Sequence, residues 1–138
     1  MQGRVAIHRT VIKPGPPLFT ITSAMYNEPL TFDVVPGKTA DTRIFQLHGP
    51  ITLGTLFDFQ KVLMAGTEKV TILDFTDSPY MDSAGLGTIL NFYVSARRRG
   101  RDIRLVAVNY RIAELLKLTS ANTLIKSYDS VEAAEAAA

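Results

Sequence analysis

The spacing of apolar and polar positions changes several times along the chain, and each change predicts a different element. Apolar runs rich in β-branched and aromatic residues predict strands over 30–35, 43–49, 70–75, 103–108 and 125–128. Between them, apolar residues recur every three or four positions, which is typical of helices with one buried face. We therefore expect helices over 53–64, from Asp82 or Ser83 to Arg99, over 112–119, and from Asp129 or Ser130 towards the C-terminus.

The same periodicity predicts which helical side chains are buried. In the first helix the expected buried positions are Leu53, Leu56, Phe57, Gln60, Leu63 and Met64. In the second they are Leu86, Ile89, Leu90, Tyr93 and Val94, and in the third Ile112, Leu115, Leu116 and Thr119. In the last helix Glu132 is placed for a capping box on Asp129, and the alanine-rich end has little to pack against, so we expect it to fray.

Strands that alternate with helices predict an α/β domain. The runs at 30–35 and 43–49 are joined by a short loop and predict an antiparallel pair at one edge of the sheet. The later, more continuously apolar runs are typical of parallel central strands covered on both faces. Residues 1–27 are rich in Pro and Thr, and the run PGPP breaks any regular element, so we expect an N-terminal extension or arm over 1–27 and one domain over 28–138.

Composition narrows the class of protein. With 138 residues, 46% of them hydrophobic and 20% charged, the chain has the make-up of one soluble globular domain. No apolar run approaches the roughly 20 residues of a membrane span, and the N-terminal residues do not resemble a secretory signal, so we expect a cytoplasmic protein. The lack of cysteine excludes disulfides and thiolate chemistry, the two histidines argue against a multi-histidine metal site, and we expect no cofactor.

The charges do not identify a nucleic-acid-binding surface. The net charge is only +2, and the dense basic run ARRRGR at 96–101 is short. Arginines at the end of a helix also complement its dipole. We therefore favour a solvated helix end, which could in addition steer an acidic partner.

The run YMDSAGLGTIL at 80–90 places Asp, Ser and two glycines between a strand and a helix. Asp82 or Ser83 is a suitable helix N-cap. Within a helix, Gly85 and Gly87 would each cost about 1 kcal/mol relative to alanine, which capping alone does not explain. Small residues allow another backbone or a partner surface to approach closely, so the run predicts more than a cap.

Three functional interpretations of this run differ in support. A phosphate-cradling loop is weakly supported, because GLG is only part of the G-x-G-x-x-G signature and no GK[ST] is present. A serine nucleophile would lack the G-x-S-x-G elbow, and its only plausible base, His48, ends a strand. A modifiable serine fits better, because Ser83 would be exposed at a helix N-terminus, where a phosphate adds about −1.5 to −2 charges that the helix dipole tolerates.

The stretch LDFTDSPYMDSAGLG at 73–87 resembles the signature (F/Y)-(M/I/V)-D-S-(S/T/A)-G-(L/I)-G of the bacterial anti-sigma factor antagonists, which are members of the STAS domain family. The resemblance covers roughly residues 28–134, including the order of strands and helices. It implies the α/β STAS fold, a small mixed sheet with an antiparallel edge pair, a parallel centre and about four helices mainly on one face.

The resemblance also implies a function, which is regulation of transcription by partner switching. In the family, the unphosphorylated antagonist binds an anti-sigma factor with serine/threonine kinase activity, phosphorylation releases it, and a serine phosphatase resets the switch. The protein would not itself be an enzyme and would contact neither nucleic acid nor a membrane directly. The implied site has Ser83 as the phosphorylated residue and a partner-binding surface of Thr52, Tyr80, Met81, Asp82, Ser83, Ala84, Gly85 and Leu86.

One position departs from the family pattern. Many members have an aspartate after the second strand that helps to form the phosphorylation site, whereas GPIT places Thr52 there, which can accept hydrogen bonds but brings no charge. An alternative therefore stays open, a constitutive STAS adaptor or scaffold in which Ser83 only caps the helix. Of the residues that flank the motif, we expect Met81 in the core and Tyr80 at the surface as an aromatic anchor.

Overall fold

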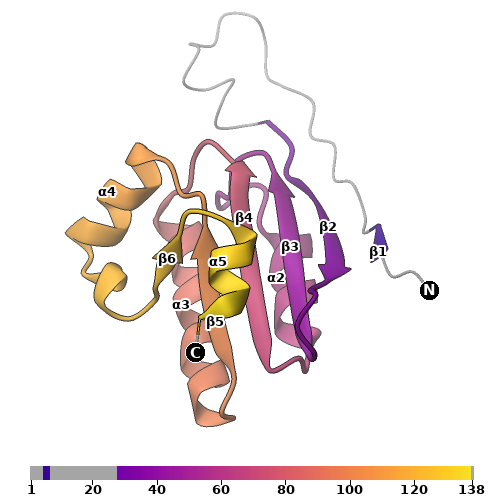
Figure 1. The fold of residues 1–138 in the computed structure, drawn as a ribbon. Helices are drawn as coiled ribbons and strands as arrows, with labels where there is room; N and C mark the ends of the chain where they lie inside the picture. The colour runs from indigo at the N-terminus through magenta and orange to yellow at the C-terminus, as the bar shows by residue number, and fades with distance from the viewer. Residues whose placement is uncertain (1–4, 7–27, 138) are drawn as a thin grey trace, which may run out of the picture.

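The computed structural model describes residues 5–6 and 28–137, which form a six-stranded sheet in the order β1-β2-β3-β4-β5-β6 (Figure 1). The strands are β1 (Val5–Ala6), β2 (Thr31–Pro36), β3 (Thr42–His48), β4 (Val70–Asp77), β5 (Asp102–Val106) and β6 (Ser127–Tyr128). β2 runs antiparallel to β1 and β3, whereas β3 to β6 run parallel to one another. The predicted mixed sheet, with antiparallel pairing at one edge and a parallel centre, is confirmed.

β1 comes from the segment 1–27 that the sequence predicts to be an arm outside the fold. Its two residues pair with Val34 and Asp33 of β2 and so extend the antiparallel edge of the sheet. The rest of that segment lies outside the described residues.

The helices lie mainly on one face of the sheet, as predicted. They are α2 (Phe57–Ala65), α3 (Ser83–Arg98), α4 (Tyr110–Leu118) and α5 (Val131–Ala136), with a short 3-10 helix η1 (Ala121–Thr123) after α4. α2, α3 and α4 contribute to the larger core on one side, and α5 covers the opposite side (Figure 1). Within the described part of the chain, the helices are too short or too polar to cross a membrane.

Alternation along the strands sorts the apolar side chains between the two faces. In β3, Phe45 and Leu47 belong to the larger core, whereas Ile44 belongs to the smaller core under α5. The larger core contains Phe32, Phe45 and Phe59, whose ring centroids lie 5.5 to 5.9 Å apart. Phe59 stands edge-on to the other two rings, a favourable arrangement for aromatic pairs.

The first helix begins later than its apolar spacing predicts. α2 starts at Phe57, because residues 52–55 form a turn that the Thr55 side chain closes. Thr55 Oγ1 donates to the Pro50 carbonyl at 2.8 Å and accepts from Thr52 N at 2.9 Å. Threonine side chains that bond to nearby backbone groups compete with helix formation, which explains the delay.

The turn also changes which face of α2 is buried. Leu56, Phe59 and Leu63 lie in the core at spacings of three and four residues. The predicted buried stripe is wrong at three positions, which are Leu53 (59% exposed), Phe57 (63%) and Met64 (39%).

The buried stripe of α3 also differs from the prediction. Leu86 and Ile89 are buried as expected, but Phe92 and Ala96 continue the stripe, and Val94 is 55% exposed. Leu86, Leu90 and Val94 are spaced four residues apart, and each such step turns by about 40° around the helix axis. After two steps, Val94 points away from the buried face.

The last two helices agree with the prediction in part. In α4, Ile112 and Leu116 are buried, whereas Thr119 is exposed at the C-cap. In α5 the N-cap is Ser130, whose Oγ accepts from Ala133 N at 3.1 Å, so the predicted cap on Asp129 is displaced by one residue.

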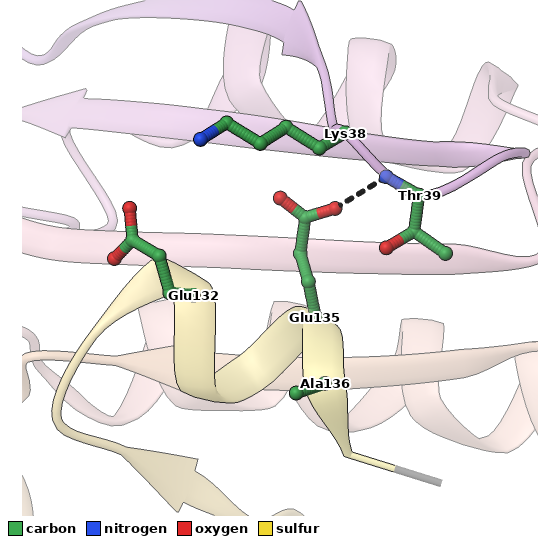
Figure 2. A pocket seen from close by; sticks show the side chains of 5 residues that line it. All are labelled: Lys38, Thr39, Glu132, Glu135 and Ala136. Carbon is green, nitrogen blue, oxygen red and sulfur yellow. Dashed lines mark hydrogen bonds between the residues drawn. The ribbon is translucent and has the colours of Figure 1, made fainter.

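A carboxylate ties the end of α5 to the β2–β3 hairpin (Figure 2). Glu135 Oε1 accepts from Thr39 N at 2.7 Å, and a Cβ at Gly37 would lie 2.7 Å from the same oxygen. Burial works to raise the pKa of the Glu135 carboxyl, but hydrogen bonds from Thr39 and Lys38 and the Lys38 charge outweigh it and lower the pKa. The ionised carboxylate therefore helps to hold α5 against the second face of the sheet.

Candidate functional site

Three loops meet at the edge of the sheet where the parallel strands end. The loops after β3 and β4 run side by side, because Ile51 N donates to Tyr80 O at 3.0 Å and Asp82 N donates to Ile51 O at 3.2 Å. From the start of α4, Asn109 Nδ2 donates to Pro79 O at 2.9 Å. The segment at 79–82, which begins the motif YMDSAGLGTIL, is therefore held by the loop after β3 on one side and by the start of α4 on the other.

Asp82 ends this segment and begins α3. Its Oδ1 accepts from Gly85 N at 2.9 Å, which makes Asp82 the N-cap, and its Oδ2 accepts from Leu53 N at 3.1 Å. The carboxylate thus joins the helix to the turn at 52–55. Of the two cap candidates in the sequence, Asp82 is the cap and Ser83 is the first residue of the helix.

Ser83 is exposed at the start of α3. Because Asp82 supplies the cap, the fold does not depend on the Ser83 hydroxyl for this purpose. The first backbone N–H groups of a helix have no acceptor within the helix, and the positive end of the helix dipole lies there. An anion attached at this position would meet a favourable field without entering the core.

The two glycines of the motif have different surroundings. A Cβ at Gly85 would lie 2.4 Å from the Ile51 carbonyl oxygen and 2.8 Å from Met81 Cγ, so this glycine allows the loop after β3 to pass close to α3. A Cβ at Gly87 would have nothing within 4 Å, and this residue is exposed. The sequence suggests that small residues allow the close approach of either another backbone or a partner surface. Gly85 allows the close approach of another backbone, whereas Gly87 leaves open space at the outer surface of α3.

Several residues expected at the partner surface lie beneath it. Met81 and Leu86 are 3% exposed, and Gly85 is also buried, so the predicted core position of Met81 is confirmed. Thr52 is 0% exposed, and its hydroxyl lies 3.3 Å from Thr55 Oγ1 within the turn. In this conformation these side chains support the surface around the motif from below.

Two of the predicted surface residues are partly buried beside the motif. Tyr80 and Ala84 both have intermediate exposure. The guanidinium carbon of Arg111 in α4 lies 5.8 Å from the centroid of the Tyr80 ring, a distance typical of a cation–π contact. The aromatic ring therefore packs towards α4 on one side of the motif.

Sequence reasoning missed two exposed apolar side chains in the segment that follows β3. Leu53 is joined to Asp82 through its backbone amide, and Phe57 begins the helix after that turn. Both were expected in the core, because their spacing fits the helical stripe. The signal that could have exposed the error is the pair Thr52 and Thr55, whose side chains favour a turn.

His48 lies at the end of β3, where each ring nitrogen approaches a carboxylate. Nδ1 is 3.2 Å from Asp77 Oδ2, and Nε2 is 3.9 Å from Asp33 Oδ2. Neither contact involves Ser83, so the geometry lends no support to a serine nucleophile with His48 as its base.

Comparison with known proteins identifies a family for most of the chain. The family model described as the STAS domain matches residues 10–134. A protein of Thermotoga neapolitana, named as a candidate anti-sigma factor antagonist, is 32% identical over 76 residues. A Thermotoga maritima protein of the same description is 30% identical over 76 residues. Each match covers 55% of this chain and 66% of the relative, just under two thirds of its length.

Solved structures with the same arrangement come from more than one kind of protein. A crystal structure of a candidate anti-sigma factor antagonist from Thermotoga maritima has a TM-score of 0.70 at 23% identity, covering 75% of this chain and 91% of that one. The Bacillus cell fate determinant SpoIIAA in its phosphorylated form has a TM-score of 0.59 at 16% identity, covering 76% and 97%. A sulfate transporter family protein from Wolinella succinogenes has a TM-score of 0.60 at 23% identity, covering 68% and 81%. At these identities the likeness establishes the fold alone.

Proposed function

The chain belongs to the STAS domain family, and we propose that within it the protein acts as an anti-sigma factor antagonist whose binding is switched by phosphorylation of Ser83. The observation that carries this proposal is the placement of Ser83. Its side chain is exposed at the first position of α3, directly after a cap that Asp82 already provides. SpoIIAA, which shares the fold, is known in both unphosphorylated and phosphorylated forms.

The exposed apolar side chains of the segment after β3, which is joined to Asp82 through the backbone amide of Leu53, supply a surface for a partner. Leu53 is 59% exposed and Phe57 is 63% exposed, and exposed apolar groups of this size are typical anchors of protein interfaces. Gly87 leaves open space above α3, so a partner backbone can approach there. We propose that an anti-sigma factor covers this surface together with Tyr80 and Ser83.

The switch follows from the different environments of the phosphate in the two states. In the isolated protein, a phosphoserine at the start of α3 remains solvated and is favoured by the helix dipole. In the complex, about −1.5 to −2 extra charges would be desolvated beside apolar anchors and beside the Asp82 carboxylate. Phosphorylation therefore leaves the fold intact and disfavours the complex.

This proposal also assigns the chemistry to the partners. The kinase activity belongs to the anti-sigma factor, a serine phosphatase removes the phosphate, and the protein itself is a binding protein that needs no cofactor. Its place of action would be the cytoplasm, where sigma factors and their regulators meet.

The test measures binding of the anti-sigma kinase of the source cell by isothermal titration calorimetry. We expect Ser83→Ala to bind without being phosphorylated in the presence of ATP, and Ser83→Asp to lose binding while its unfolding free energy changes by less than about 0.5 kcal/mol. Thr67→Asp, at an exposed loop residue after α2, is the matched charge control and should bind as the unmodified protein does. If Ser83→Asp binds as tightly as this control, the switch is refuted.

The alternative, an unswitched STAS adaptor, is favoured by one specific observation. Thr52 is wholly buried and uncharged at the position where many family members have an aspartate, so this chain lacks that contribution to a phosphorylation site. The fold also occurs in a sulfate transporter family protein. Under this alternative Ser83→Asp and Ser83→Ala would both bind the partner, and intact-mass measurements of the protein from its native cell would find no phosphate on Ser83.

A further inference from the structure

A cavity of about 200 Å³ lies at the outer edge of the sheet, where β5 and the segment leading into β6 part from each other. The hydrogen bond from Leu105 N to Lys126 O, at 3.0 Å, joins the two segments. Ile103 N, two residues earlier in β5, is instead bonded to the side chain of its neighbour, Asp102 Oδ1, at 2.9 Å. The chain before Lys126 therefore leaves the edge of β5 uncovered, and the cavity occupies the gap.

Three cationic side chains from separate parts of the chain line this cavity. Arg97 comes from the end of α3, Arg104 from β5 and Lys126 from the segment before β6. The cavity is also lined by the Asp102 carboxylate, but both of its oxygens are engaged, Oδ1 by Ile103 N and Oδ2 by Arg104 Nε at 2.9 Å. Within the described part of the chain, no carboxylate lies within ion-pair distance of Arg97 or Lys126, so two positive charges remain unneutralised there.

Two of these cations already have contacts within the protein. Arg104 is 8% exposed, and it donates from Nε to Asp102 Oδ2 and from Nη1 to the Ala134 carbonyl at 2.6 Å, so its Nη2 is the nitrogen left for a ligand. The guanidinium carbon of Arg97 lies 5.7 Å from the centroid of the Tyr93 ring. Prior fixing of the donors reduces the entropy lost on binding, and planar guanidinium groups match the oxygens of phosphate.

The remaining wall of the cavity is apolar or aromatic. Ile103 is buried at its base, Leu124 is 51% exposed at its rim, and Tyr128 contributes a partly buried ring. The volume is smaller than the roughly 300–1,000 Å³ of pockets for drug-sized ligands, so the occupant must be compact. An anionic group and a small organic group are thus both accommodated.

We propose that this cavity binds a small phosphomonoester, with the phosphate bound mainly by Arg97 and Lys126 and contacted by the remaining Nη2 of Arg104, and with the organic group against Leu124 and Tyr128. The site lies about 21 Å along α3 from Ser83, as measured by the helical rise between positions 83 and 97. It involves none of the residues that carry the proposed phosphorylation switch. The short basic run at 96–101, which looks in the sequence like a solvated helix end, contributes Arg97 to a site that also needs β5 and the segment before β6.

The test titrates the full chain, labelled with ¹⁵N, with phenyl phosphate and separately with inorganic phosphate, each against sodium chloride of equal ionic strength. We expect saturable shifts of the backbone amides at 103 and 124–128, with phenyl phosphate the tighter ligand because its ring meets the apolar wall. Lys126→Gln and Arg97→Gln each remove one charge-assisted contact and should weaken binding by about tenfold or more.

The matched control is Arg98→Gln, which removes the same charge from an exposed residue beside Arg97 that does not line the cavity. Its affinity for phenyl phosphate should equal that of the unmodified protein. Equal weakening by Arg98→Gln and Lys126→Gln would show diffuse charge attraction and overturn the proposal. Shifts that do not saturate, or equal affinities for the two phosphates, would overturn it as well.

Discussion

Replacing Gly85 by alanine would place a methyl group against a backbone that has little room to move. The added Cβ would lie 2.4 Å from Ile51 O, a carbonyl that also accepts the hydrogen bond from Asp82 N. The other near neighbours, Met81 Cγ at 2.8 Å and Ile51 Cγ2 at 2.9 Å, are atoms of buried side chains. The loop after β3 must therefore shift, and the junction between that loop and α3 must open with it.

The expected change in the free energy of unfolding can be compared with that for Gly87, a second glycine in the same helix. Overpacking costs about 1–3 kcal/mol, and weakening the bond at Ile51 O adds about 1 kcal/mol. Alanine recovers about 1 kcal/mol of helix propensity, so Gly85→Ala should destabilise the protein by about 1–3 kcal/mol. Gly87→Ala meets nothing within 4 Å and should stabilise it by about 0.5–1 kcal/mol. The two substitutions should therefore have opposite signs.

The assay is urea unfolding followed by far-ultraviolet circular dichroism, with the unmodified protein and both variants measured together. A lower midpoint for Gly85→Ala and a higher one for Gly87→Ala, with equal slopes, would agree with the packing argument. If Gly85→Ala were as stable as Gly87→Ala, the close approach of Ile51 to α3 would not be what requires glycine at position 85, and the reasoning would be refuted.

Three further predictions concern other parts of the fold. The lowered pKa of Glu135 means that its ionised carboxylate stabilises the fold, and this stabilisation should be lost as the pH falls below 4.5, the usual pKa of glutamate. In acid unfolding curves, Glu135→Gln should therefore lose less stability over this pH range than the unmodified protein does. Arg43→Met keeps apolar contact with Phe45 but deprives carbonyls at the end of α2 of their donor, and should lower the unfolding free energy in urea by about 1–3 kcal/mol. Phe57→Ser should leave that free energy within about 0.5 kcal/mol and weaken anti-sigma factor binding in calorimetry, whereas Met64→Ser, near the other end of α2, should not weaken it.

Local patterns were sufficient for strands β2 to β6 and for the presence of helices α2 to α5, and they placed the start of α3 to within one residue. The strand at 70–75 is β-branched and nearly continuous in apolar residues, and it is the central parallel strand β4. Asp82 was one of two cap candidates because short polar side chains suit that position, and it is the cap. These features depend on residues within one or two turns of each other, so a pattern read along the chain can detect them.

The candidate surface was harder to predict, because it depends on how separate segments meet. A turn closed by Thr55 shifted the phase of α2 and moved Leu53 and Phe57 from the expected core to the surface. The same periodic spacing is compatible with both outcomes, since periodicity does not reveal where a helix begins. Thr52, which was expected at the partner surface, is buried because it takes part in the turn that Thr55 closes.

By itself, the sequence determined the order and type of the elements from β2 onwards apart from η1, the mixed character of the sheet, and the position of Asp82 and Ser83 at the start of a helix. Periodicity, capping and turn chemistry act over a few residues, and these properties follow from them. The tertiary structure alone decided which glycine of the motif faces another backbone and which apolar side chains remain exposed. It also brought Arg97, Arg104 and Lys126 to one cavity. Those outcomes depend on packing between segments that are distant along the chain, which no local pattern records.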